Sequence, residues 1–401
     1  MALMRESRWS SCLLLALLAG GCGSCSSSGS KAGTGGTGGG ATGGATAKGG
    51  AGGAGATGTG GSTGSGGATT GNSGGATGTG GSGAGGGAAT TAGGIFTAPE
   101  PWTKDVSALT KDGSSDAIIA ALDKAGGWGT GSFQIDFSIP LFVANSSTPR
   151  ETISGPAPGG YSYCYGGPDC DPVPLQMPIP TNGNAESSNN YTCDTSNNDC
   201  HILVVETSQK KLYELYNATA AGSGIDALAA FVWDLTKTYP DNERGDQCTS
   251  ADAGGFPIAG LLPTADEVAA GAVNHAIRFI LPNKSMRKAA YVHPASHAGS
   301  PSSTDANAPP YGVRFRLKGS FDASSYNTAE KVIIAALKKY GMLLSDGGNV
   351  PLTFADDRTT TAKWATLGIT ASSFSGITAD DFEVVDFSTP IVSTQDCVRN
   401  P

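Results

Sequence analysis

Apolar and polar residues alternate along most of the chain beyond residue 95, and this alternation predicts strands. In "YGVRFRLKG" (311–319), Val313, Phe315 and Leu317 are separated by basic residues. Because successive side chains of a strand point to opposite faces, a period of two predicts a strand with one buried face. Comparable runs predict further strands in "SFQIDFSIPLFVA", "HILVVETSQKKLYELYNATA", "AAFVWDL", "NHAIRFILP" and "FEVVDF". The second of these runs contains a Thr-Ser-Gln turn and therefore predicts a hairpin.

Helical periodicity is found in three stretches. The clearest, "TAEKVIIAALKKYG" (328–341), has Thr328 as its expected N-cap, carries one apolar stripe and ends at Gly341. The stretches "SSDAIIAALDKAG" (114–126) and "TADEVAAG" (264–271) predict two shorter helices. Many strands with few helices predict a mainly β fold. We expect an antiparallel β-sandwich or jelly roll with a few helices packed on it.

The chain before residue 95 has a different character. Arg5 and Arg8 precede the apolar run "CLLLALLAGG", which is too short to span a bilayer and predicts an export signal over residues 1–21. "LLAGGC" resembles a bacterial lipoprotein signal, in which the cysteine, here Cys22, is lipidated; simple secretion is the alternative. Residues 22–94 are almost entirely Gly, Ala, Thr and Ser, so they should form a disordered tether. We therefore expect one domain, residues 95–401, in the cell envelope or outside the cell.

The cysteines support an exported location. Six of the nine lie within residues 95–401, and an even number in an exported domain predicts disulfides. Several pairings are compatible with the sequence. We expect Cys164–Cys170, Cys193–Cys200 and Cys248–Cys397, because the first two pairs close short loops. Zinc binding is the rival interpretation, but none of these six cysteines forms a C-x2-C pair.

Charge and motifs exclude several function classes. The formal charge of −9 argues against nucleic acid and against an anionic membrane surface as partners, so we expect membrane contact only through the lipid anchor. Residues 95–401 contain neither G-x-S-x-G nor G-x-x-x-x-G-K-[ST], so the expected domain lacks the markers of a serine-hydrolase elbow and of a P-loop. We expect no cofactor. The acidic loops "GGPDCDP" and "FADDR" could hold calcium, although neither has EF-hand spacing.

Taken together, the motifs resemble a family of secreted proteins that is frequent in actinobacteria and myxobacteria. The resemblance rests on "DCHILVVE…LYELYNA", "CTSADAGGFPI", "DEVAAGAVNHAIRFILP", "PPYGVRFRLK" and "LKKYGMLLSDGG", in that order within residues 95–401. It implies no particular activity. The chain departs from the family at His293, where relatives usually carry an aromatic residue. The positions marked by the family pattern are His201, Glu214, Asp252, His275, His297, Arg314 and Asp346.

Glu214 and Asp252 form the candidate acid–base pair. Apolar and aromatic neighbours in its strand would raise the pKa of Glu214. Asp252 lies among small residues in "TSADAGGFPI", where the backbone can approach closely and the carboxylate could face a cleft. Enzymes that cleave sugar polymers place two carboxylates about 5–10 Å apart. Structural roles stay open for both residues, because Asp252 could bond its own turn and Glu214 could pair with an arginine.

The histidines of "YVHPASH" suggest a shared metal only at first sight. His293 and His297 are four residues apart, but Pro294 disfavours the helix that would place them on one face, so we predict no metal site. His297 is instead the third catalytic candidate. The candidate substrate-binding residues are His201, His275, Arg314 and Asp346. A lone strand histidine more often has a hydrogen-bonded structural role, and a solvated face is the default for Arg314, so both alternatives stay open.

These features favour an exported enzyme that cleaves extracellular polysaccharide by hydrolysis or by lyase chemistry. The basis is the expected fold, compartment and tether, together with polar residues inside strand motifs; a fold alone does not establish a function. A non-catalytic carbohydrate- or surface-binding module is the alternative. The enzyme interpretation requires Glu214, Asp252, His297 and Arg314 to converge in one cleft.

Overall fold

The computed structural model describes residues 90–155 and 168–401. The predicted signal peptide, the lipidation site Cys22 and the tether up to residue 89 lie outside these residues. Within the described part of the chain, every helix is too short or too polar to span a bilayer. The predictions about the export signal and the anchor therefore stay predictions.

The fold is mainly β, as predicted, and is built on two six-stranded sheets. The first has the order β15-β12-β13-β10-β14-β3 and the second the order β4-β7-β8-β9-β5-β6. The strands of the first sheet are β15 (Phe382–Val384), β12 (Arg314–Leu317), β13 (Met342–Gly347), β10 (Ile277–Leu281), β14 (Leu352–Ala355) and β3 (Ile135–Ile139). Those of the second are β4 (Leu141–Ala144), β7 (Ile202–Glu206), β8 (Lys211–Ala221), β9 (Gly224–Asp234), β5 (Arg150–Ser154) and β6 (Leu175–Pro178). Two short sheets pair β1 (Thr90–Ala92) with β2 (Pro99–Lys104), and β11 (Ala290–Tyr291) with β16 (Ile391–Val392).

Both large sheets have mixed pairing, so the expectation of exclusively antiparallel sheets was wrong. In the first sheet β13 runs parallel to β10 and β3 parallel to β14. In the second, β7 runs parallel to β4 and β5 parallel to β9. Parallel neighbours are joined by long crossovers, which the alternation within a strand does not reveal. The predicted hairpin is confirmed, because β7 and β8 are antiparallel and Glu206 lies opposite Lys211.

Strand β7 is buried on both faces, which explains its uninterrupted apolar run. Leu203 and Val205 pack into a large core that also contains side chains of the first sheet. Ile202 and Val204 pack into a second, smaller core. Glu214 of β8 lies opposite Leu203 in the ladder, so its side chain faces the large core.

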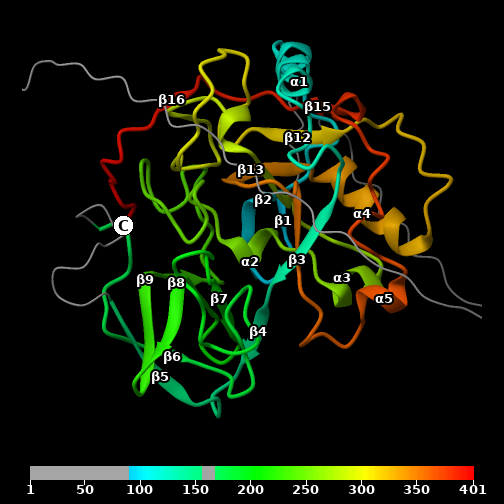
Figure 1. Ribbon diagram of the computed structural model, residues 1–401. Coiled ribbons are helices and arrows are strands. Elements are labelled where there is room, and N and C mark those ends of the chain that lie inside the picture. The colour runs from blue at the N-terminus through cyan, green and yellow to red at the C-terminus, as the bar shows by residue number, and fades with distance from the viewer. Residues whose placement is uncertain (1–89, 156–167) are drawn as a thin grey trace, which may run out of the picture. The chain divides into compact units, whose positions relative to one another are not determined.

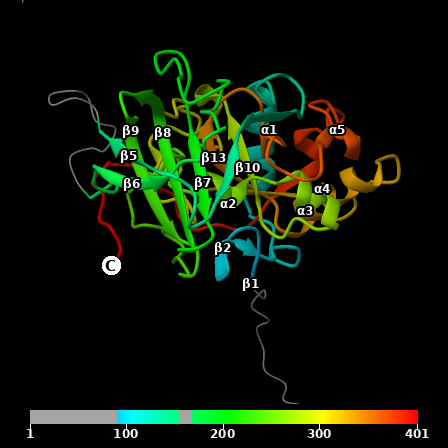
Figure 2. The same ribbon diagram turned by 90° about the horizontal axis from the view of Figure 1, so that it is seen from below.

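The predicted helices are confirmed with one change at a cap. The α4 helix (Thr328–Lys339) begins one residue after its N-cap, which is Asn327 rather than Thr328. Glu330 N–H donates to Asn327 Oδ1 at 2.8 Å, and the Glu330 carboxylate accepts from Asn327 N–H, so the two residues form a capping box. The other helices are α1 (Ser115–Lys124), α2 (Ile258–Leu261), α3 (Ala265–Ala270), α5 (Trp364–Leu367) and the 3-10 turns Asn283–Ser285 and Ala379–Asp381. Figures 1 and 2 show α3, α4 and α5 on one side and β5, β6, β8 and β9 on the other.

Two of the three expected disulfides are confirmed. Cys193 is bonded to Cys200, and Cys248 to Cys397. The third expected pair includes Cys164, which lies outside the described residues. The Cys248–Cys397 bond fixes the C-terminal segment to the chain four residues before Asp252, and the Cys193–Cys200 bond closes the loop before β7.

Candidate functional site

The candidate site is built on the loop "TSADAGGF" (249–256), which packs tightly against β13. Gly254 N–H donates to the Ser345 carbonyl at 2.7 Å, and Ser296 N–H donates to the Gly254 carbonyl at 2.9 Å. The φ of Gly255 is +93°, and a Cβ atom there would lie 1.9 Å from Ser296 Oγ. Only glycine fits this conformation and this contact. The small residues therefore allow the close backbone approach that the sequence suggested, and they bring Asp252 to the first sheet.

Arg278 of β10 joins Asp252 to Asp346 of β13. Its Nε and Nη2 donate to Asp252 at 3.1 and 3.0 Å, and Nη2 also donates to Asp346 Oδ2 at 2.9 Å. The third nitrogen, Nη1, donates to Thr353 Oγ1 at 2.9 Å. Burial alone would lower the pKa of Arg278, but the two carboxylates raise it. Each guanidinium nitrogen has an acceptor, which offsets the cost of burying the charge.

Asp346 is the accessible member of this pair of carboxyl groups. Asp252 has no exposed surface, whereas 21% of the Asp346 side chain is exposed. Burial and the charge of Asp252 raise the pKa of Asp346, and a hydrogen bond to the Asp252 carboxylate raises it further, although Arg278 lowers it. Asp346 therefore retains a proton at pH values where an ordinary aspartate is ionised. A carboxyl group of this kind, open on one side, can donate a proton to a bound substrate.

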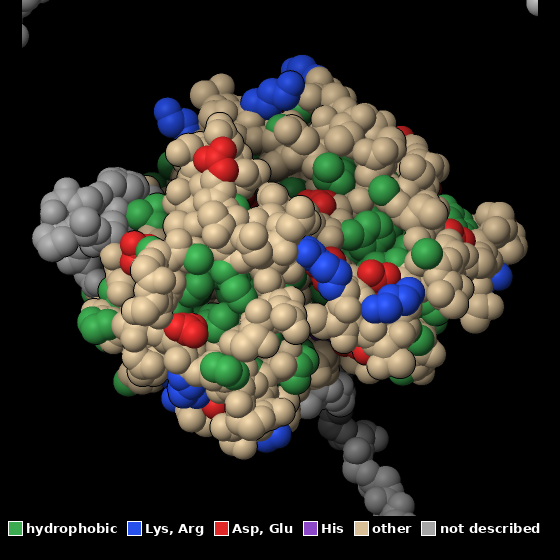
Figure 3. Space-filling view, turned by 60° about the horizontal axis from the view of Figure 1, so that its bottom comes forward, with side chains coloured by type: hydrophobic (Ala, Val, Ile, Leu, Met, Phe, Trp, Pro, Cys, Tyr) green, Lys and Arg blue, Asp and Glu red, His purple; other side chains and the backbone are tan. Residues whose placement is uncertain are grey.

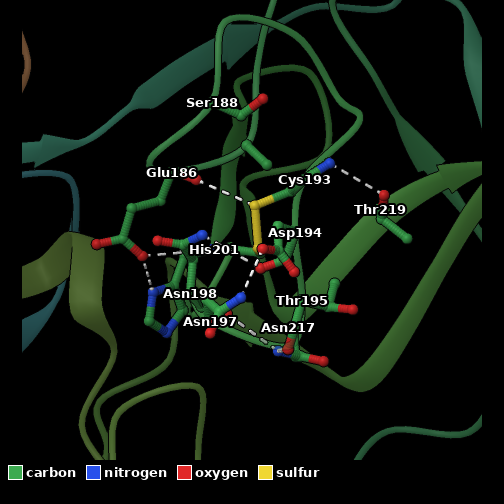
Figure 4. The surroundings of a disulfide bond; sticks show 12 residues. Glu186, Ser188, Cys193, Asp194, Thr195, Asn197, Asn198, His201, Asn217 and Thr219 are labelled. Carbon is green, nitrogen blue, oxygen red and sulfur yellow. Dashed lines mark hydrogen bonds and ion pairs between the residues drawn. A yellow bond between two sulfur atoms is a disulfide. The ribbon is translucent and has the colours of Figure 1, made fainter. Parts of the chain in front are cut away.

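A second ion pair, His201 with Glu186, lies against the same loop. His201 Nδ1 is 2.6 Å from Glu186 Oε2, and Nε2 is 3.1 Å from the carbonyl of Ala251, the residue before Asp252. Burial alone would lower the pKa of His201, but Glu186 raises it to about 9. In the same way, burial would raise the pKa of Glu186, but His201 lowers it to about 2. The protonated ring thus donates at both nitrogens and ties the second sheet to the Asp252 loop. Figure 4 shows the Glu186 carboxylate directed at this ring.

A polar hollow of about 570 Å³ adjoins these groups. Its lining includes Glu186, the segment 195–199, Tyr216 and Asn217, so it consists mainly of hydroxyl and amide side chains. The Cys193–Cys200 disulfide fixes the segment that forms one wall, and Figure 4 shows Thr195, Asn197 and Asn198 next to this bond. Glu186 of this lining contacts His201, and His201 contacts the carbonyl of Ala251, so the hollow lies next to the Asp252 loop.

Asp199 is the second carboxyl group of the site that is open to solvent. Partial loss of water raises its pKa, and the charges of Asp346 and Glu186 raise it as well, whereas His201 and Arg278 lower it. Among the described residues, none donates a hydrogen bond to the Asp199 carboxylate. The Glu186 carboxylate, in contrast, accepts hydrogen bonds from His201 and Ser138. Asp199 is therefore the carboxylate of the hollow that is left for a ligand.

Glu214 lies outside this cluster. It has no exposed surface; its Oε2 accepts from Trp233 Nε1 at 3.1 Å and its Oε1 from Ala259 N–H at 2.9 Å. Burial raises the pKa of Glu214 and these two hydrogen bonds lower it, and the net result is a pKa of about 7. Because Ala259 belongs to the first turn of α2, Glu214 fastens β8 to that helix. The structure does not bring Glu214 and Asp252 together in a cleft.

His297 lies beside the Asp252 loop, as predicted for a site residue. Its Nδ1 is 2.8 Å from the carbonyl of Ala253, and its ring has no exposed surface. Burial lowers the pKa of His297, and the charges of Asp169 and Asp346 raise it. We therefore assign His297 a role in holding the loop rather than direct contact with a substrate.

His275 and Arg314 lie at other places in the fold. His275 Nε2 is 3.5 Å from Glu267 Oε1 of α3, so it pairs with a helix away from the Asp252 loop. Arg314 donates to the carbonyls of Pro101 and Lys104 at 2.8 and 3.4 Å. Its guanidinium group is thus used by the backbone around β2. The four-residue convergence of Glu214, Asp252, His297 and Arg314 is not observed.

Three residues of the site were missed by the sequence analysis as site residues. These are Arg278, Glu186 and Asp199. Arg278 had a usable signal, because a charge inside the apolar run "HAIRFILP" must be paired when that strand is buried. Glu186 and Asp199 lie in irregular segments whose position depends on tertiary contacts, so the pattern of residues gives no comparable signal.

The described residues offer no combination of groups that favours a metal. One group of three potential ligands, Asp169, Cys248 and Cys397, lies within 4.8 Å, but its two sulfurs are bonded to each other. The candidate calcium loop around Asp171 is engaged by arginines, since Arg244 and Arg399 donate to that carboxylate. In "FADDR", the Asp356 carboxylate accepts from Arg358 and the Asp357 carboxylate from Trp364 N–H.

Comparison with known proteins adds no assignment. No family model, no curated protein and no solved structure matches this chain. The resemblance to secreted actinobacterial and myxobacterial proteins stays a prediction, and any proposed function depends on the site itself.

Proposed function

We propose that the protein is an exported, lipid-anchored hydrolase of extracellular polysaccharide, with Asp346 as the proton donor. One observation carries the proposal: Arg278 holds Asp346 against the Asp252 carboxylate, which raises the pKa of Asp346, while the Asp346 side chain stays partly exposed. A polar hollow lies next to the Asp252 loop. Two disulfides support an oxidising compartment. We keep the β-sandwich interpretation, because side chains of both large sheets contribute to one core.

The chemistry requires one proton to move twice. Asp346 gives its proton to the glycosidic oxygen as the bond between that oxygen and the anomeric carbon breaks. Water adds to the anomeric carbon and loses a proton, which restores Asp346. Asp252 is a positioning residue in this scheme, because its charge and hydrogen bond keep the proton on Asp346. General acid catalysis of this kind typically contributes about 10²–10⁴-fold in rate.

The test is release of reducing ends from a panel of neutral, amino-substituted and uronic polysaccharides by the full chain. We expect turnover on at least one polymer and a loss of at least about 100-fold in the Asp346→Asn variant. Asp226→Asn is the matched control, because Asp226 is an exposed carboxylate of β9 in the second sheet and outside the hollow. If Asp346→Asn retains full activity, Asp346 is not the proton donor.

A non-catalytic carbohydrate-binding module is the second candidate, and the hollow itself favours it. Amide and hydroxyl side chains with one aromatic ring, Tyr216, suit a hydroxyl-rich ligand without any chemistry. Binding of oligosaccharides without release of reducing ends from any polymer would support this candidate over the hydrolase.

A further inference from the structure

We propose that the polar hollow lined by Glu186, Asp199 and Tyr216 is a subsite for a sugar that carries a positive charge, such as an amino sugar, with Asp199 as its ion-pair partner. This inference rests on the proposed function, because it names the substrate class of the same site. The side chains that line the hollow support this inference. Most are uncharged hydrogen-bonding groups, and the charged ones are the carboxylates of Glu186 and Asp199.

Asp199 has the environment expected of a ligand-binding carboxylate. It lines the hollow and has no hydrogen-bond donor among the described residues. The other lining carboxylate, Glu186, is already taken by His201 and Ser138. An ammonium group in the hollow would give Asp199 the partner that the protein does not supply.

The cations near the hollow are not free to bind an anion. Arg278 donates from all three nitrogens, to Asp252, Asp346 and Thr353. His201 uses both ring nitrogens, on Glu186 and on the carbonyl of Ala251. No Lys or Arg is among the described residues that line the hollow. On the face shown in Figure 3, Lys and Arg side chains occur in small, separate groups.

These facts disfavour polyuronates as substrates. A uronic acid polymer carries a carboxylate on each sugar, and a site that binds it needs cations or donors with free capacity. Here such a carboxylate would instead meet Asp199 and Glu186. A lyase that acts on uronates would need to stabilise additional negative charge at the same place. The site therefore favours hydrolysis of an amino-substituted glycan.

The test is calorimetric binding of three oligosaccharides of equal length to the full chain at pH 6 and low ionic strength. The probes are an oligomer of glucosamine, its N-acetylated counterpart and an oligogalacturonate. We expect affinity to fall in that order. In Asp199→Asn we expect the glucosamine oligomer to lose about tenfold, the equivalent of about 1.4 kcal/mol, while the acetylated oligomer is unchanged. Asp226→Asn is the control, since it removes one negative charge from the same sheet outside the hollow.

The outcomes separate this inference from the proposed function. Tight binding of the oligogalacturonate, or an equal loss of both glucosamine probes in Asp199→Asn, overturns the charge-selective subsite. Loss of all turnover in Asp199→Asn with unchanged binding would make Asp199 a catalytic base instead, which also overturns it. Because binding is measured without turnover, the order of affinities holds or fails even if the hydrolase proposal is wrong.

Discussion

Among the carboxyl groups whose pKa values are raised, Glu214 and Asp346 have very different surroundings. Glu214 is sealed between β8 and α2 and accepts one hydrogen bond from an indole and one from a backbone amide. Asp346 shares Arg278 with Asp252 and keeps about a fifth of its side chain in contact with solvent (21%). Burial is the largest cause of the raised pKa in both.

The difference shows that a shifted pKa alone does not identify a catalytic acid. Structural carboxyl groups reach similar values when they are buried. Access to a substrate distinguishes Asp346, because 21% of its side chain is exposed and no surface of Glu214 is. Glu214 was a catalytic candidate because an apolar neighbourhood predicts the raised pKa, but the same neighbourhood also predicts that the side chain is buried.

The largest effect should come from removing the cation that Asp346 and Asp252 share. Arg278→Leu leaves Asp252 buried without its partner, and we expect a loss of about 3–5 kcal/mol in the free energy of unfolding. Urea denaturation measures this loss. Lys111→Leu is the control, because its ion pair with Asp116 is exposed to solvent and should contribute little to stability. A loss below about 1 kcal/mol in Arg278→Leu would show that the contacts of Arg278 with Asp252 and Asp346 contribute little to the stability of the fold.

The next effect is a dependence of stability on pH. The pKa of Glu214 is raised from 4.5 to about 7. Its contribution to the free energy of unfolding is therefore fully present below pH 4.5 and is lost as the pH rises through 7. Linkage gives up to about 3 kcal/mol for a shift of this size. The pKa of Asp346 is raised as well, so it acts in the same direction. We expect the domain to be more stable at pH 5 than at pH 8.

Glu214→Gln isolates the part that belongs to the sealed carboxyl. Glutamine cannot ionise, so the difference in unfolding free energy between pH 5 and pH 8 should shrink relative to the parent protein, while oligosaccharide affinity stays the same. An unchanged difference would place the titrating group elsewhere. Weakened binding in Glu214→Gln would contradict the assignment of a structural role to Glu214.

The smallest effect on stability is expected for Asp346→Asn. Asparagine can still accept from Arg278, and the substitution removes a carboxyl group that lies against another one. We expect the free energy of unfolding at pH 6 to change by less than about 1 kcal/mol, although the activity falls as described above. Thermal unfolding at pH 6 provides the measurement. A change of several kcal/mol would place Asp346 with Glu214 among the structural carboxyl groups.

The elements themselves were largely predictable from the sequence. The hairpin of β7 and β8, the helices α1, α3 and α4 and the Cys193–Cys200 disulfide follow from local signals such as alternation, caps and cysteine spacing. The Cys248–Cys397 bond joins positions 149 residues apart, so no local signal specifies it. The parallel pairs were not predictable, because β10 and β13 are brought together by tertiary contacts between segments far apart in the chain.

The site was predictable only in part, for the same physical reason. Asp252, His297 and Asp346 were predicted as site residues, and the structure places them around one loop, whereas His275 and Arg314 bind other partners. Asp199 was not predicted, because its importance arises from a disulfide-closed loop whose position depends on tertiary contacts. Arg278 could have been found from its position inside an apolar strand, where a charge requires a partner.

The three-way contact of Arg278 also limits how this protein can change. Asp252, Asp346 and Thr353 all depend on one side chain, so the effect of substituting any of them depends on the other three. Substitution of Arg278 alone leaves the buried charge of Asp252 without a partner. A second substitution, at Asp252, removes that charge and restores part of the lost stability. Lineages that drift at these positions should therefore keep the four residues together or replace them together, and intermediates with one replacement should be rare.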